Sequence, residues 1–156
     1  MPVTSAKPTS IDGYLEAMTR AVFSAGMSSK VIDAKWDGTV EAFDRFDAKK
    51  VAAYTPDDVE RLVGDARIVR NRKKVEATVW NAGELLVVER EFGGVEEYFA
   101  SVGESAALVK DLHKRFKFLG ESVARMFLYT VAWRPEEQEA WARSRFTEEQ
   151  MRRHGG

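Results

Sequence analysis

FDRFDAKKVAAYTPDDVERLVGDARIVRNRKKVEATVWNA, residues 43–82, is the stretch of the chain that decides its fold. It contains a complete helix start, because Thr55 is suited to be an N-cap, Pro56 fits the first helical position and acidic residues fill the first turn. A second helix is predicted behind it, with four apolar side chains on one face at helical spacing: Val75, Val79, Ala82 and Leu86. The entry to this second helix carries a cluster of cations: Arg67, Arg70, Arg72, Lys73 and Lys74.

The rest of the chain also shows helical periodicity. Glycines at 93–94 are expected to end the long helix. A further helix is predicted over residues 123–131, and Pro135 opens a last one, which we expect Trp141 to anchor. No segment alternates apolar and polar residues as a half-buried strand does. The sequence therefore predicts an all-α protein.

Length and composition favour one soluble domain. The chain has 156 residues, of which 44% are hydrophobic and 31% charged, and its net charge is −1. We expect a flexible N-terminal tail over residues 1–9, a single helical domain over 10–151 and a C-terminal tail over 152–156. There is no cysteine, no signal-like stretch and no apolar run of about 20 residues, so we expect a cytoplasmic monomer with no membrane contact.

A second basic cluster precedes a glycine turn. Lys110, Lys114, Arg115 and Lys117 lead into Phe118, Gly120 and Ser122. A tight turn that feeds a helix aims unbonded N–H groups at one point, and the helix dipole favours an anion there, so the pattern predicts a phosphate site. Glu121 works against it. Solvated helix faces carry similar charge clusters, and because the net charge is near zero, any affinity for DNA must be local.

The order and spacing of several motifs resemble the DNA-3-methyladenine glycosylase I family over about residues 14–133. The motifs lie at 14–16, 21–29, 43–47, 58–62, 68–72, 81–82 and 114–120. The resemblance implies a two-lobed helix-hairpin-helix DNA glycosylase fold with a cleft between the lobes. It also implies base-excision repair, in which a damaged alkylated base is flipped out of double-stranded, distorted DNA and its N-glycosidic bond is hydrolysed. The residues that it places on DNA are Gly26, Met27, Arg70, Arg72, Lys73, Lys74, Lys114, Lys117, Phe118, Gly120 and Ser122.

The chain departs from the family at the residues that carry the chemistry. The family's pocket glutamate falls on Ala21 and its stacking tryptophan on Ser29. The candidates to rebuild a pocket are Tyr14, Glu16, Ser29, Asp33 and Trp36, although aromatic residues at helical spacing are usually packing residues, and we favour packing for Tyr14 and Trp36. The family's cysteine and histidine zinc ligands are missing, so no zinc or other cofactor is expected.

Three hypotheses for the function stay open. The first, to which we lean, is an active DNA N-glycosylase of altered specificity. The second is a catalytically silent DNA-binding homologue, and the third is a helical protein-interaction module. Met27 is part of this question, because it could insert into the gap left by a flipped base or simply pack beneath the Gly26 turn.

Overall fold

Every regular element in the described part of the chain is a helix, which confirms the all-α prediction. The computed structural model describes residues 5–154, with side chains up to Arg145 and at Thr147. The elements are α1 (Ile11–Ser24), α2 (Ser29–Ala42), the 3-10 turn η1 (Asp44–Phe46), α3 (Ala48–Ala52), α4 (Pro56–Val63), α5 (Arg72–Phe92), α6 (Val95–Val102), α7 (Ser105–Arg115), α8 (Glu121–Thr130) and α9 (Pro135–His154).

The helix boundaries follow local sequence signals. At the start of α4, Thr55 and Asp58 form a reciprocal capping box and Pro56 is the first helical residue. Helix α5 is capped by Asn71 and ends at Gly93, whose φ of 86° lies in the left-handed region that glycine adopts without strain. The predicted start of α4, end of α5 and start of α9 are confirmed.

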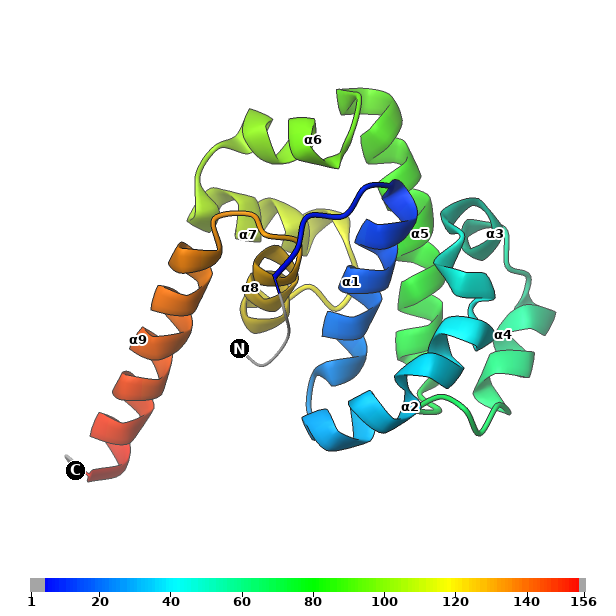
Figure 1. Ribbon diagram of the computed structural model, residues 1–156, viewed down its shortest axis with the longest axis horizontal. Coiled ribbons are helices and arrows are strands. Elements are labelled where there is room, and N and C mark those ends of the chain that lie inside the picture. Colours follow the sequence, from blue (N-terminus) through cyan, green and yellow to red (C-terminus); the bar gives the residue numbers. More distant parts are fainter. Residues whose placement is uncertain (1–4, 155–156) are drawn as a thin grey trace.

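Helix α5 is the central element of the fold. It packs against α1, α3, α4 and α6. In Figure 1, α1 runs beside α5, the group α2–α4 lies on one side of this pair, and α6–α8 lie on the other. Helix α9 packs on α8, where the Arg125 guanidinium lies 5.4 Å from the centre of the Trp141 ring, as the expected anchoring role of Trp141 requires. The two-lobed arrangement stays a prediction.

Aromatic side chains fill the core on the α2–α4 side. Phe43 is fully buried and stacks on Phe46, with ring centres 5.4 Å apart and planes at 11°. Trp36 stacks on the other face of this group, 5.6 Å from Phe46. These contacts hold η1 in a left-handed turn, with φ between 53° and 55° at Asp44, Arg45 and Phe46. Tertiary packing therefore overrides the local backbone preference there.

The two segments expected to be tails are described in part, and their extent stays a prediction. Residues 5–9 lie along the fold: the Ala6 N–H bonds to the Thr130 carbonyl at 3.0 Å, and the Ser5 hydroxyl donates to the Tyr129 carbonyl at 2.6 Å. At the other end, α9 continues through residues 152–154, while residues 1–4 and 155–156 lie outside the described part. None of the helices described is both long enough and apolar enough to cross a bilayer.

Phe43→Ala tests the aromatic core. We expect the free energy of unfolding to fall by about 3–5 kcal/mol, because a fully buried ring leaves a cavity when it is truncated. Val31→Ala is the control: Val31 is 38% exposed, so we expect a change within about 0.5 kcal/mol. Denaturant unfolding followed by circular dichroism measures both, and equal losses would contradict the role given to Phe43.

Candidate functional site

A hairpin joins α7 to α8 and presents its outer side to solvent. Phe116 and Leu119 are buried, whereas Lys117 and Phe118 are exposed. Phe118 has a φ of 64°, which is uncommon for a residue that is not glycine. The hairpin therefore uses its apolar residues at 116 and 119 as anchors and turns the segment between them outward.

The inner polar groups of the hairpin are bonded to the rest of the protein. Asn81 of α5 is buried, and its side chain bonds both the N–H of Lys117, at 2.8 Å, and the carbonyl of Lys117, at 3.1 Å. The Trp80 indole N–H donates to the Arg115 carbonyl at 3.1 Å. The Leu119 carbonyl lies 3.3 Å from Nδ1 of His113. Helix α5 thus fixes the position of the hairpin.

The N-terminus of α8 is open. Gly120 is its N-cap and offers no side chain to bond the first amides, and nothing lies within 4 Å of the place where a Cβ would be. The N–H groups of the first turn, from Glu121 and Ser122 onward, are therefore available to an acceptor from outside. Glu121 is exposed, and its carboxylate pairs loosely with Arg125, at 3.9 Å.

Three exposed lysines lie near this opening: Lys110 and Lys114 line a pocket with Gly120 and Glu121, and Lys117 lies in the hairpin that precedes Gly120. None of them forms an ion pair with another residue in the described part of the chain. Lys117 instead lies over the Trp80 ring, 4.6 Å from its centre, and Trp80 is 50% exposed. Arg115 is different, because its guanidinium is paired with Glu84, Glu91 and Asp111 and so contributes little outward charge.

The residues of the first basic cluster, at the entry to α5, differ in exposure and in their partners. Arg70 and Lys73 are exposed, but Arg72 pairs with Glu60 at 2.6 Å. Lys74 was predicted to contact DNA, and that assignment needs correction: it is only 7% exposed. Its ammonium donates to the Ala25 carbonyl at 2.8 Å, and its pKa is lowered by burial.

Lys74 therefore supports the turn that follows α1. It binds carbonyls at the C-terminus of that helix, where the dipole favours a cation. Gly26 has a φ of 75° in this turn, and Met27 beside it is 37% exposed. The side chain is partly exposed and lines a cavity, so both interpretations of Met27, insertion and packing beneath the turn, stay predictions.

A cavity of about 220 Å³ opens beside this turn. It lies at the C-terminal end of α1 and the N-terminal end of α2, and one side chain of α8 completes it. Its lining is Arg20, Ser24, Met27, Ser29, Ile32, Asp33 and Met126. It includes two of the predicted pocket residues, Ser29 and Asp33, and none of the described residues that line it is aromatic. Ala21, at the family's glutamate position, is buried in α1.

Arg20 organises the remaining pocket candidates and was missed by the sequence analysis. Its guanidinium pairs with the Asp33 carboxylate and lies 5.0 Å from the centre of the Trp36 ring. The Trp36 indole N–H donates to Glu16 at 3.2 Å. Trp36 is mainly a core residue at 8% exposure, which confirms the packing interpretation. The sequence feature that could have identified Arg20 was its position next to Ala21 on the same helix.

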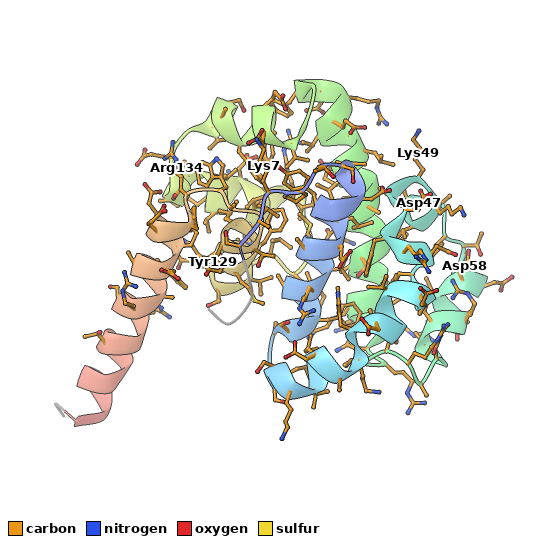
Figure 2. The ribbon with its side chains drawn as sticks, in the orientation of Figure 1. Lys7, Asp47, Lys49, Asp58, Tyr129 and Arg134 are labelled. Carbon is orange, nitrogen blue, oxygen red and sulfur yellow. The ribbon has the colours of Figure 1, made fainter. Side chains whose placement is uncertain are left out.

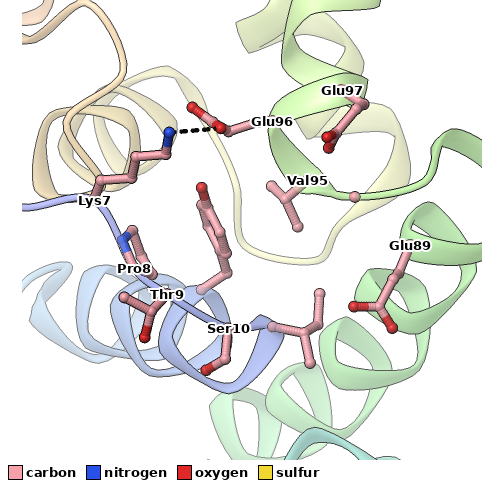
Figure 3. A pocket seen from close by; sticks show the side chains of 11 residues that line it. Lys7, Pro8, Thr9, Ser10, Glu89, Val95, Glu96 and Glu97 are labelled. Carbon is pink, nitrogen blue, oxygen red and sulfur yellow. Dashed lines mark ion pairs between the residues drawn. The ribbon is translucent and has the colours of Figure 1, made fainter.

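Tyr14 lies away from this cavity, so its assignment to the candidate pocket needs correction. Its ring packs edge-on against Phe99 of α6, 6.1 Å between centres. It lines a separate pocket of about 490 Å³ beside the N-terminal segment, where Figure 3 shows Lys7 paired with Glu96 at 2.7 Å. Burial, together with Glu96 and Glu97, raises the pKa of the Tyr14 hydroxyl to about 12.

The residues present do not fit the zinc site that the family resemblance implies. The chain has no cysteine. In the described part of the chain, no three His, Asp or Glu side chains are grouped so that they could hold a metal ion. His113 faces the Leu119 carbonyl of the hairpin. The absence of zinc stays a prediction.

Comparison with known proteins identifies the family. The sequence model described as methyladenine glycosylase matches residues 8–114. The chain belongs to the methyladenine glycosylase family. It is 34% identical to DNA-3-methyladenine glycosylase 1 of Escherichia coli K12 over 67% of each chain, and 29% identical to the DNA-3-methyladenine glycosylase of Haemophilus influenzae over 69% of each.

Solved structures of methyladenine glycosylases share the fold. A crystal structure of 3-methyladenine DNA glycosylase I has a TM-score of 0.72 and 27% identity, and the match covers 82% of each chain. A structure of the Staphylococcus aureus enzyme, described as showing the basis of 3-methyladenine recognition, has a TM-score of 0.74 and 27% identity over 85% of this chain and 81% of that one. The suspected family resemblance is confirmed.

Asn81→Ala tests the support of the hairpin. We expect a loss of about 1–3 kcal/mol in the free energy of unfolding, because two partly buried backbone groups of Lys117 lose their partner. Amide hydrogen exchange at Lys117 should accelerate more than exchange in the middle of α5. Lys114→Ala, an exposed change beside the same hairpin, is the control; unchanged exchange at Lys117 in Asn81→Ala would refute the clamp.

Proposed function

We propose that this member of the methyladenine glycosylase family is a base-excision-repair DNA glycosylase. It binds double-stranded DNA at a damaged or distorted position and hydrolyses the N-glycosidic bond of one flipped base. The single observation that carries the proposal is the uncapped α8 N-terminus, which lines a pocket with Lys110 and Lys114, in a chain of this family. We further propose that it acts as a monomer in the cytoplasm.

The hairpin is proposed to hold the phosphate backbone. The amides of the first turn of α8 and the helix dipole favour a phosphate oxygen, and the lysines add affinity that does not depend on sequence. Lys117 and Arg72 also line one groove of about 360 Å³, together with Trp80, so the two basic clusters meet there in space. Arg70 and Lys73 extend the positive surface at the start of α5.

Met27 is proposed to fill the gap that the flipped base leaves. It is exposed, flexible and apolar, and it lies at the rim of the 220 Å³ cavity, so insertion between base pairs and delivery of the base to that cavity are compatible. The Lys74 ammonium holds the backbone of this turn in place.

A silent DNA-binding homologue is the second candidate. It is favoured by the cavity itself, because the described residues that line it include neither an aromatic ring nor a carboxylate free of an ion pair. Incubation of the full chain with duplexes carrying alkylated, deaminated or oxidised bases separates the two. Release of any of these bases supports the enzyme. Binding to DNA with no release at high protein concentration supports the silent binder, and the absence of both supports an interaction module.

Lys117→Glu should weaken binding to duplex DNA and lower the slope of log affinity against log salt concentration by about 1. Lys49→Glu makes the same charge change on α3, at an exposed position remote from the hairpin, as Figure 2 shows, and serves as the matched control. Mobility-shift titrations at several salt concentrations measure both. Equal effects of the two variants would refute hairpin binding and leave only non-specific attraction.

A further inference from the structure

We propose that the cavity between α1 and α2 accepts a neutral oxopurine, the product of purine deamination, and that Arg20 donates hydrogen bonds to it. A cationic alkylated base is disfavoured in the same cavity. The inference rests on the proposed function, because it names the substrate class for that site. Arg20 would then be the residue that sets the specificity.

The groups that would attract a cationic base are already used by a resident cation. The Arg20 guanidinium pairs with Asp33, which is the one carboxylate that the described residues bring to the cavity lining, and lies 5.0 Å from the centre of the Trp36 ring. Ion pairing and a ring face are the two means by which such a site holds a positive charge. An incoming cation would have to displace Arg20 while being repelled by it.

Arg20 also has donors left for a neutral ligand. A guanidinium carries five N–H groups in a planar fork, and within the described residues Asp33 is the one hydrogen-bond acceptor that Arg20 has. The side chain is 22% exposed and lines the cavity. This fork matches the O6 and N7 acceptors on one edge of an oxopurine, as arginine does when it reads guanine in DNA.

The remaining lining suits one planar base. Met27, Ile32 and Met126 supply apolar contacts for the ring faces, and the Ser29 hydroxyl adds a polar group at the rim. The Ser24 hydroxyl is engaged with the Arg20 carbonyl at 2.6 Å. A volume of about 220 Å³ is on the scale of a single nucleobase, and the sugar would stay outside.

Arg20 fits the chemistry of releasing a neutral base. When the bond between the sugar C1′ and the base N9 breaks, its electron pair stays on the base, so negative charge develops on the purine ring. A cation that bonds O6 and N7 stabilises that charge as it forms. Water adds its oxygen to C1′ and its proton neutralises the departing base, which gives the free oxopurine and an abasic sugar. A base that is already cationic gains nothing from this contact.

Guanine presents the same O6 and N7 acceptors as hypoxanthine. The free energy needed to flip the base out of the duplex distinguishes the two. Hypoxanthine formed from adenine lies opposite thymine as a mismatch, whereas guanine lies in a stable pair with cytosine. Extrusion costs least for a mismatched base, so the cavity receives the deaminated purine preferentially.

Base release from two substrates tests the inference. We expect the full chain to release hypoxanthine from a duplex with hypoxanthine opposite thymine faster than 3-methyladenine from methylated DNA. Arg20→Gln should lower hypoxanthine release about tenfold or more, since a bidentate contact is lost, without changing affinity for undamaged duplex. Lys30→Gln removes an exposed charge at the start of α2, outside the cavity lining. It should change release less than twofold. Release of 3-methyladenine as fast as hypoxanthine overturns the inference.

Titration with free ligands separates the inference from the proposed function. Hypoxanthine should quench or shift the tryptophan fluorescence, through Trp36 beside Arg20, and an N3,N9-dialkylated adeninium salt, which is a fixed cation, should not. Arg20→Glu should reverse this preference, with Arg20→Gln as the second variant if Arg20→Glu unfolds. If hypoxanthine binds through Arg20 but no base is released from DNA, the cavity assignment stands and the enzymatic function fails. If neither ligand binds, or the cation binds better to the native chain, the cavity assignment is overturned.

Discussion

The buried side chain of Asn81 is the contact on which the candidate DNA-binding surface depends. It lies in the middle of the central helix α5 and satisfies both polar groups of the Lys117 peptide. A buried amide that bonds an N–H and a carbonyl fixes the backbone in position and direction, because losing either bond leaves a polar group unsatisfied. The hairpin can therefore turn its outer amides to solvent without losing its shape. The left-handed φ at Phe118 is maintained by the same surroundings.

The cavity shows how one helix can invert the charge of a site. Residues 20 and 21 are adjacent on α1, so their side chains point about 100° apart around the helix. With alanine at the position where the family has glutamate, the negative charge is absent, and Arg20 places a positive charge beside the Trp36 ring. Asp33 and Glu16 then act as partners of Arg20 and Trp36 and are no longer free acids. The Trp36 ring lies in the core, and the face beside Arg20 is used within the protein.

The sequence predicted the helices well because their ends depend on short-range signals. The Thr55 cap, Pro56 and the left-handed Gly93 act within a few residues, and the structure uses each of them as expected. The roles of charged residues were less predictable. In the sequence, nothing distinguishes Lys74 from its exposed neighbour Lys73. The helical rotation of about 100° between them turns Lys74 toward the end of α1, where its ammonium donates to two carbonyls.

The candidate site shows the same limit. The resemblance assigned the family's glutamate to Ala21 and its tryptophan to Ser29, which stays a prediction, and the cavity lies beside Ser29. It did not indicate what takes their place, because the Arg20–Asp33 pair joins two helices and depends on how α1 crosses α2. Tyr14 was assigned to the wrong pocket for a similar reason. Its helix face is determined by Phe99 of α6, 85 residues further along the chain, a partner that local periodicity does not identify.

Helix α5 connects the two parts of the proposed site. Near its start Lys74 holds the turn that carries Gly26 and Met27, and about two turns later Asn81 holds the hairpin that precedes α8. A packed helix is rigid, so α5 itself sets the distance between the turn that carries Met27 and the hairpin that precedes α8. Because both side chains bond backbone groups, the spacing does not depend on which residues occupy the turns. The proposed base cavity can therefore carry a different charge, here that of Arg20, while the candidate DNA-binding surface keeps its geometry.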